Sequence, residues 1–92
     1  MGNAAKGKSI EAIARDIADG YIYVNPLMLK GFDADSLKDL YYKLTKVQVD
    51  TRTEKYPFND TQEIRRRNLK LQRLFNSIVI LKNYLREKRI VV

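Results

Sequence analysis

The feature that most constrains the fold is a repeat of apolar residues in the last third of the chain. After Asp60, apolar side chains recur three, four and seven positions apart, at Ile64, Leu71, Leu74, Ile78, Leu81 and Leu85. Phe75 widens this stripe, which predicts one amphipathic helix because residues at such spacings share a side of an α-helix. Asp60 and Glu63 form a variant capping box at its start. A helix over residues 61–88 would be roughly 40 Å long.

A second helical pattern precedes this one. Its apolar stripe consists of Leu37, Leu40, Tyr41, Leu44 and Val47. We expect a helix that opens at Asp33 or Asp35, continues to about residue 50, and packs antiparallel against residues 61–88. Pro57 breaks the chain between the two. Residues 45–54 also alternate in polarity, which is strand periodicity, but the helix is preferred because no breaker interrupts the stripe.

The N-terminal third predicts a shorter helix. Ser9 is a suitable N-cap, and apolar residues follow at helical spacing, at Ile10, Ile13, Ala14, Ile17 and Ala18. Gly20 supplies the left-handed residue that commonly ends a helix. We therefore expect a helix over residues 10–19, preceded by a flexible N-terminus over residues 1–8. Residues 9–92 are assigned to a single helical domain, because a chain of 92 residues supports only one core.

An aromatic and β-branched segment over residues 21–24 links the first two helices, and this composition favours an extended backbone. Asn25 and Pro26 then predict a single helical turn over residues 26–30. We expect residues 21–24 to be a connector that covers the core; the alternative is a stacking surface made by its tyrosines. Pairing with residues 45–54 would make the protein α+β. The favoured fold class is mainly α, a small three-helix domain built on a long antiparallel helical hairpin.

The residue types that most enzymes use are scarce. The chain has no His and no Cys, and so lacks a base that titrates near neutral pH, a thiolate nucleophile and a soft metal ligand. Asp33, Asp35 and Asp39 cluster where a helix begins, and the helix dipole already favours acids there. The sequence contains no glycine-rich phosphate loop. We therefore expect a non-enzymatic protein without catalytic residues, a metal or a cofactor.

Location follows from what the sequence lacks. Residues 1–9 have no apolar core of the kind that a signal peptide requires. Apolar runs are at most four residues long, whereas a bilayer-spanning helix needs roughly 20. Without cysteine there is no disulfide framework. These features predict a cytoplasmic protein with no membrane partner.

Charge is distributed unevenly along the chain. The net charge is +7, and residues 1–62 hold nine residues of each sign, so the whole excess lies in residues 63–92. In that segment only Glu63 and Glu87 are acidic. The basic residues there are Arg65, Arg66, Arg67, Lys70, Arg73, Lys82, Arg86, Lys88 and Arg89. Such asymmetry bears on the partners of a protein rather than on its fold.

The first five of these basic residues are the stronger candidates for a binding site. Arg66, Lys70 and Arg73 recur at helical spacing on one face, and Arg65 and Arg67 flank them. They lie in the N-terminal half of the predicted helix, where the dipole disfavours cations, so helix stability does not explain them. Guanidinium groups pair bidentately with phosphate oxygens. We expect these five side chains to contact a nucleic-acid backbone.

Each basic group also has a structural alternative. The arginine cluster would be a solvated helix face balanced by Asp50 and Glu54 of the preceding helix. The four C-terminal cations lie where the helix dipole favours them, although they would extend a phosphate-binding patch. Tyr84 lies among them, and packing is the more common role for such a ring.

The leading hypothesis is a small basic helical protein that binds the phosphate backbone of nucleic acid through its C-terminal helix, within a larger nucleoprotein assembly. DNA and RNA stay unresolved. The alternative is a protein–protein module, such as a regulator, an inhibitor, an assembly factor or a homo-oligomer. Apolar residues away from the main stripe motivate this alternative, namely Leu69, Val79, Ile80 and the segment 21–29.

Overall fold

Side-chain caps determine where each helix begins. In the computed structural model, which describes residues 9–54 and 60–92, Ser9, Asn25, Asp33 and Asp60 each accept a hydrogen bond from the backbone N–H three residues later. These bonds satisfy amides that have no partner within the first helical turn. The four caps open α1 (Ile10–Ala18), α2 (Pro26–Leu29), α3 (Ala34–Thr53) and α4 (Thr61–Glu87). Each cap is one that the sequence predicts; the expectation for residues 1–8 lies outside the described residues.

The ambiguous segment over residues 45–54 is helical as far as Thr53, so the strand alternative is wrong. The side chains of two of its threonines form hydrogen bonds within the helix. Thr45 Oγ1 donates to the Tyr41 carbonyl, and Thr53 Oγ1 donates to the Val49 carbonyl. Thr51 is buried. Tertiary packing along α3 therefore outweighs the β-propensity of the alternating threonines and valines.

Residues 21–24 form the expected connector, and no strand occurs in residues 9–54 or 60–92. Val24 is buried and Ile22 half-buried against the core, whereas Tyr21 and Tyr23 are exposed. The segment therefore covers the core with its aliphatic side chains.

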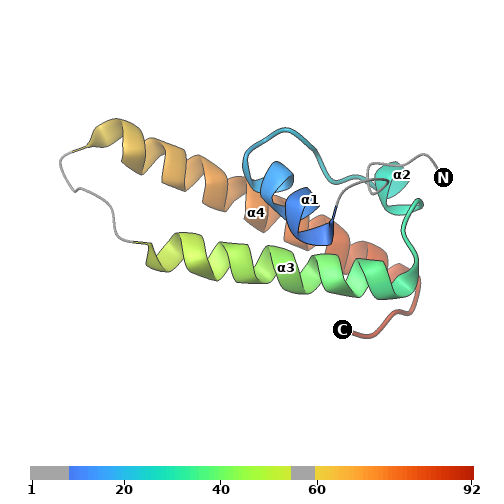
Figure 1. Cartoon of the computed structure of the whole chain (residues 1–92). Coiled ribbons are helices and arrows are strands. Elements are labelled where there is room, and N and C mark those ends of the chain that lie inside the picture. The colour runs from blue at the N-terminus through green and yellow to red at the C-terminus, as the bar shows by residue number, and fades with distance from the viewer. Residues whose placement is uncertain (1–8, 55–59) are drawn as a thin grey trace.

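The helices form a hairpin with a third helix laid across it (Figure 1). α3 and α4 run antiparallel along their length, and α1 packs against both of them. α2 packs against α4, near Ile80 and Tyr84 in its C-terminal part. α2 and the end of the connector therefore cover this part of α4. The fold is thus mainly α and is built on a long antiparallel hairpin, as the sequence predicts.

The apolar stripe of α4 divides between two environments. Leu74, Leu81 and Leu85 are completely or almost completely buried, and they join α1 and α3 in one core. Leu71 and Ile78, only three residues from core leucines, are half-buried. The two sides of the hairpin are therefore covered unequally. None of the described helices is both long and apolar enough to cross a membrane.

Candidate nucleic-acid interface

Arg73, one of the predicted phosphate contacts, is a structural residue in this fold. α1 ends in a Schellman arrangement in which Gly20 adopts a positive φ of 87°, and the N–H groups of Gly20 and Tyr21 donate to carbonyls within the helix. The half-buried Arg73 side chain lies over Gly20, and its Nη1 donates to the carbonyl of Ala18 at 3.3 Å. A cation at a helix C-terminus is favoured by the dipole. Arg73 thus caps α1 and fastens it to α4.

Arg67 has a similar role at the end of α3. Its Nη2 donates to the carbonyl of Arg52 at 2.7 Å, and the side chain is half-buried. Arg52 is in the last helical turn of α3, so this guanidinium also meets the negative end of a helix dipole. The bond joins the start of α4 to the end of α3. Sequence reasoning had no local signal for it, because the two residues are 15 positions apart.

Arg65 and Arg66 remain on the surface. Arg66 Nη1 donates to Glu63 Oε1 at 2.8 Å, in an exposed pair one helical turn apart. Such a pair contributes little to stability and can exchange for another anion. Both guanidinium groups are therefore accessible to a phosphate, although they lie near the first turn of α4.

Lys70 is placed beside acids. It lines a hollow of about 300 Å³ together with Arg15, Val47, Asp50, Thr51 and Glu54, which come from α1, from α3 and from the residue that ends α3. Asp50 and Glu54 are the two carboxylates that the structural alternative names as balancing charges. The arrangement favours that alternative for Lys70, because neighbouring carboxylates oppose the approach of a phosphate.

The four C-terminal cations are exposed, and two of them take part in the end of α4. Arg89 adopts a φ of 60° and the N–H of Ile90 donates to the Leu85 carbonyl, which closes the helix. Lys88 Nζ lies 5.6 Å from the centre of the Tyr84 ring, a cation–π distance. Tyr84 itself is buried, so its ring packs in the fold. Lys82 and Arg86 lie on the exposed surface of α4.

The position of α1 defines two faces of the hairpin. We call the side turned to α1 the proximal face. On this side Val47 and Asp50 of α3 and Lys70 of α4 line the hollow beside α1. Arg73 of α4 contacts α1 directly. Each residue turns a helix by about 100°, so residues two positions apart point to nearly opposite sides. Phe75 therefore points away from α1. We call that opposite side the distal face.

Two stripes of three- and four-residue spacing form the distal face. They are Lys38, Tyr41, Thr45, Gln48 and Arg52 on α3, and Asn68, Leu71, Phe75, Ile78, Lys82 and Arg86 on α4. Phe75 is 60% exposed, and Val79 beside this stripe is 40% exposed. Tyr41 is half-buried, with its ring edge-on to that of Tyr42 at 5.8 Å between centres. The face thus presents cations, amides and an exposed aromatic ring.

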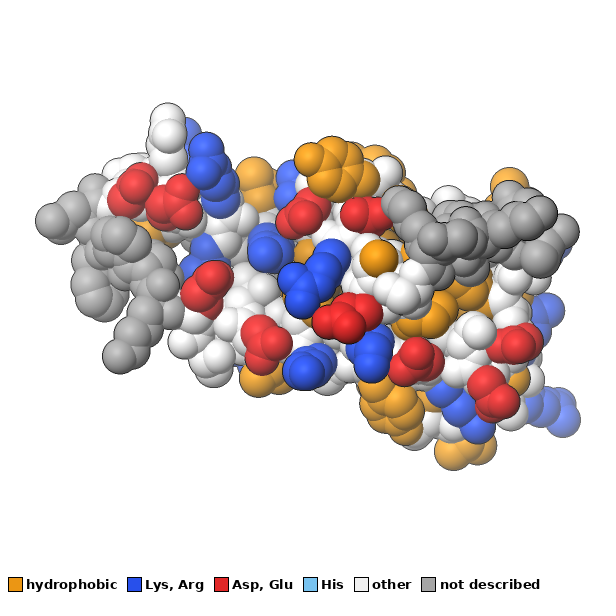
Figure 2. Space-filling view, in the orientation of Figure 1, with side chains coloured by type: hydrophobic (Ala, Val, Ile, Leu, Met, Phe, Trp, Pro, Cys, Tyr) orange, Lys and Arg blue, Asp and Glu red, His pale blue; other side chains and the backbone are white. Residues whose placement is uncertain are grey.

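Acidic residues are distributed very differently on the two sides. Within the described helices α3 and α4, the distal stripes contain four cations and no acid. The acids of these helices fall outside the distal register, at Asp35, Asp39, Asp50, Glu63 and Glu87. Figure 2 shows acidic and basic side chains interspersed over the face that α1 and α3 present. The distal face is consequently the side on which positive charge is not neutralised locally.

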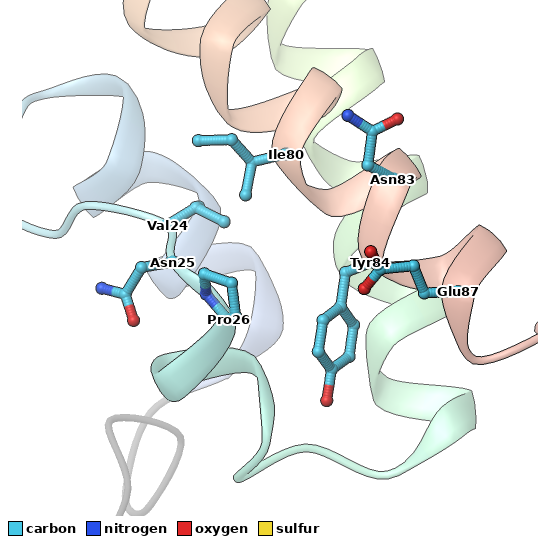
Figure 3. A pocket seen from close by; sticks show the side chains of 7 residues that line it. All are labelled: Val24, Asn25, Pro26, Ile80, Asn83, Tyr84 and Glu87. Atoms are coloured by element: carbon cyan, nitrogen blue, oxygen red, sulfur yellow. The ribbon is translucent and has the colours of Figure 1, made fainter.

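A separate groove lies between the connector and the C-terminal part of α4 (Figure 3). It has a volume of about 310 Å³, and Val24 and Pro26 line one side while Ile80 and Tyr84 line the other. Asn25, Asn83 and Glu87 complete the lining. The connector and α2 form one wall of this groove. They also carry three large side chains that are each more than 70% exposed, namely Tyr21, Tyr23 and Leu27. Apolar side chains are therefore exposed around this groove as well as along the hairpin.

The aspartates at the start of α3 act as helix-forming residues. Asp33 Oδ1 accepts the Ser36 N–H at 2.7 Å, and hydrogen bonds from the Ser36 backbone and side chain lower the pKa of the Asp33 carboxyl below its ordinary value. Across the described part of the chain, no group of three or more His, Cys, Asp or Glu side chains could hold a metal ion.

In comparisons with known proteins, the chain matches no protein-family model, no curated protein and no solved structure. The site therefore has to be judged from its own geometry. Of the nine predicted basic residues, Lys82 and Arg86 lie on the distal face, Arg67 and Arg73 are hydrogen-bonded within the fold, and Lys70 lines the hollow that also contains Asp50 and Glu54. Sequence reasoning missed Lys38 and Arg52. The signal that could have found them is the run of residues 38, 41, 45, 48 and 52, which has the same spacing as the distal stripe of α4.

Proposed function

We propose that the protein is a non-enzymatic nucleic-acid-binding module whose distal face contacts the phosphate backbone. The observation that carries this proposal is the segregation of charge: Lys38, Arg52, Lys82 and Arg86 share a face on which α3 and α4 place no acid. Lysine and arginine side chains that neutralise phosphates release bound counterions, and this release drives binding. Arg65 and Arg66 are exposed near the start of α4, but Arg66 shares the register of Lys70 and Arg73 and therefore lies outside the distal face.

The remaining features of the face agree with this proposal. Amide side chains from Gln48 and Asn68 lie between the cations, and such groups commonly donate to phosphate and sugar oxygens. The nine-residue α1 already covers the proximal face, where Arg73 is occupied by the Ala18 carbonyl. As part of the same proposal, the module acts in the cytoplasm as a subunit of a larger nucleoprotein assembly.

The test is a pair of double charge reversals of equal size. Lys82→Glu with Arg86→Glu changes the distal face, and Arg15→Glu with Lys46→Glu makes the same change of net charge on exposed residues outside it. We expect the distal pair to lower the affinity for nucleic acid and to reduce the slope of log K against log salt by about two. The control pair should leave that slope nearly unchanged.

Binding is measured by fluorescence anisotropy between roughly 50 and 200 mM salt. Equal losses from both pairs would mean that net charge alone attracts nucleic acid, and the distal face would then be the wrong site. Absence of binding by the unmodified protein, even at the lowest salt, would refute the proposed function.

A second candidate function, a protein–protein module, is favoured by the groove beside α2. Its walls are mainly apolar, with Val24 and Pro26 facing Ile80 and Tyr84, and the connector and α2 that form one wall also expose Tyr23 and Leu27. Grooves of this kind accept an apolar side chain of a partner. This candidate predicts that Ile80→Asp, which leaves the distal face intact, abolishes partner capture while nucleic-acid affinity is retained.

A further inference from the structure

We propose that the ligand of the distal face is a single-stranded nucleic acid, and that Phe75 is the platform on which one of its bases stacks. This inference rests on the proposed function and adds the structural class of the ligand to it. The deciding observation is the position of one aromatic ring between Arg52 at one end of the distal face and Lys82 and Arg86 toward the other.

Phe75 has no evident role in holding the fold together. Its side chain is 60% exposed, near the middle of a helix that runs from Thr61 to Glu87. Among the described residues it belongs neither to the buried core nor to the partly buried side chains that pack against that core. An isolated exposed phenylalanine would carry little meaning. This one lies on the same side as four cations and no helical acid.

The cations and the aromatic ring lie along the distal face in an order that suits the phosphates and one base of a single strand. Arg52 lies at the end of α3 that adjoins the start of α4, as its carbonyl contact with Arg67 shows. Lys82 and Arg86 lie toward the opposite end of α4, with Phe75 between. A strand laid along the hairpin can place phosphates at both ends and turn an unstacked base toward the ring. Base–aromatic stacking of this kind is worth a substantial part of single-strand affinity and tolerates any base.

A duplex makes poorer use of the same surface. Its bases are stacked on one another inside the helix, so a ring on the protein surface meets sugars and phosphates. Phe75 would then be desolvated against polar groups with no base face to contact. Cations alone would still hold a duplex, but the ring would contribute nothing.

A second copy of the chain is also a poor occupant. A two-fold contact through this face would set the same cations against one another, because an isologous interface pairs each patch with itself. Like charges across an interface are unfavourable. The charge of the face therefore selects an anionic partner, and the exposed ring selects an anion that carries aromatic bases.

The experiment compares three labelled probes of equal length, an oligouridine, an oligothymidine and a mixed-sequence duplex, with the full chain. We expect the single strands to bind at least about ten-fold more tightly than the duplex. Phe75→Ala should weaken single-strand binding by about 5- to 150-fold, the range for loss of one stacked base. Duplex affinity should change less than about two-fold. Phe75→Tyr, which keeps the ring, should retain single-strand affinity.

Val79→Ala is the matched control, because it removes exposed apolar surface from a neighbouring position without removing a ring. It should leave all three affinities nearly unchanged, and circular dichroism should show native helix content for every variant. Tighter binding of one single strand than of the other also supports the inference, because either strand offers unstacked bases to the ring.

Three outcomes would overturn the inference. Equal affinity for duplex and single strands would do so, as would a Phe75→Ala effect that is the same on all probes or is reproduced by Val79→Ala. Each of these leaves the proposed function standing, since nucleic acid is still bound. Failure to bind any probe, together with capture of an acidic protein segment at the same face, would instead reject both proposals.

Discussion

The two faces of the α3–α4 hairpin use the same residue types for different purposes. On the proximal face, Arg73 donates to the last carbonyl of α1 and lies over Gly20, so its guanidinium group holds α1 against α4. On the distal face, Lys82 and Arg86 are exposed. The apolar residues differ in the same way, because Leu74 is completely buried while Phe75, the next residue, is mostly exposed. A single helix thus stabilises the fold with one side and leaves cations and an aromatic ring exposed on the other.

The difference shows that the number of cations in a stretch of sequence does not tell which of them remain exposed. The start of α4 is the most basic stretch of the chain, yet Arg67 and Arg73 both serve helix C-termini. Their location in the N-terminal half of α4 disagrees with the dipole of their own helix but agrees with the dipoles of α3 and α1. Charge-reversal of Arg66, Lys70 and Arg73 together would consequently disturb the attachment of α1 as well as any ligand.

The largest contrast between the faces should come from removing one apolar side chain from each. Leu81→Ala leaves a cavity in the core, where Leu81 is completely buried, and should lower the free energy of unfolding by about 2–5 kcal/mol. Phe75→Ala removes a mostly exposed ring and should change it by less than about 0.5 kcal/mol. Urea denaturation followed by circular dichroism measures both.

Leu81→Met is the control for the first of these variants, because it keeps the volume of the side chain and should cost less than about 1.5 kcal/mol. Comparable losses for Leu81→Ala and Phe75→Ala would mean that both faces are packed equally, and the distinction between them would fail.

Much of the fold could be predicted because its signals are local. Ser9, Asn25, Asp33 and Asp60 are caps whose amide partners lie three residues away, and the stripes of α3 and α4 follow from spacing alone. The end of α3 was less certain, because the threonines of residues 45–53 fit a strand as well as a helix. Their helical state depends on packing against α4, which no short window of sequence contains.

The candidate site could be predicted only in part, for a related reason. Spacing correctly places Arg66, Lys70 and Arg73 on one side of α4, but the direction of that side depends on where α1 packs. Leu71 and Leu74 are equally apolar in the sequence, and only the tertiary arrangement makes one half-buried and the other core. Lys38 and Arg52 were missed because they join the site from the other helix of the hairpin.

A smaller contrast separates structural from exposed arginines. Arg73→Met keeps much of the side-chain bulk but removes the hydrogen bond to the Ala18 carbonyl, and it should lower the free energy of unfolding by about 1–3 kcal/mol. Arg86→Met removes an exposed charge and should change stability by less than about 0.5 kcal/mol. When binding is measured on folded protein, Arg86→Met should lower the affinity for nucleic acid more than Arg73→Met does. A larger stability loss for Arg86→Met would contradict the assignment of the two roles.

The smallest effect should be common to both faces, because α3 lines each of them and Asp33 caps α3. The pKa of Asp33 is lowered by the hydrogen bonds from Ser36, so the folded state binds this proton more weakly than the unfolded state does. The resulting contribution to stability is complete above the ordinary pKa of 3.8 and is lost as the pH falls through the lowered folded-state value.

Asp33→Asn keeps a capping oxygen of similar strength but does not titrate. We expect the unfolding free energy of the unmodified protein, measured relative to that of Asp33→Asn, to decrease as the pH falls from the ordinary pKa through the lowered folded-state pKa, and to be constant at higher pH. A difference independent of pH would show that the carboxylate charge adds nothing to the cap. At neutral pH the salt dependence of nucleic-acid binding should be the same for both proteins, because the substitution changes the helix end and leaves the cations of the distal face in place.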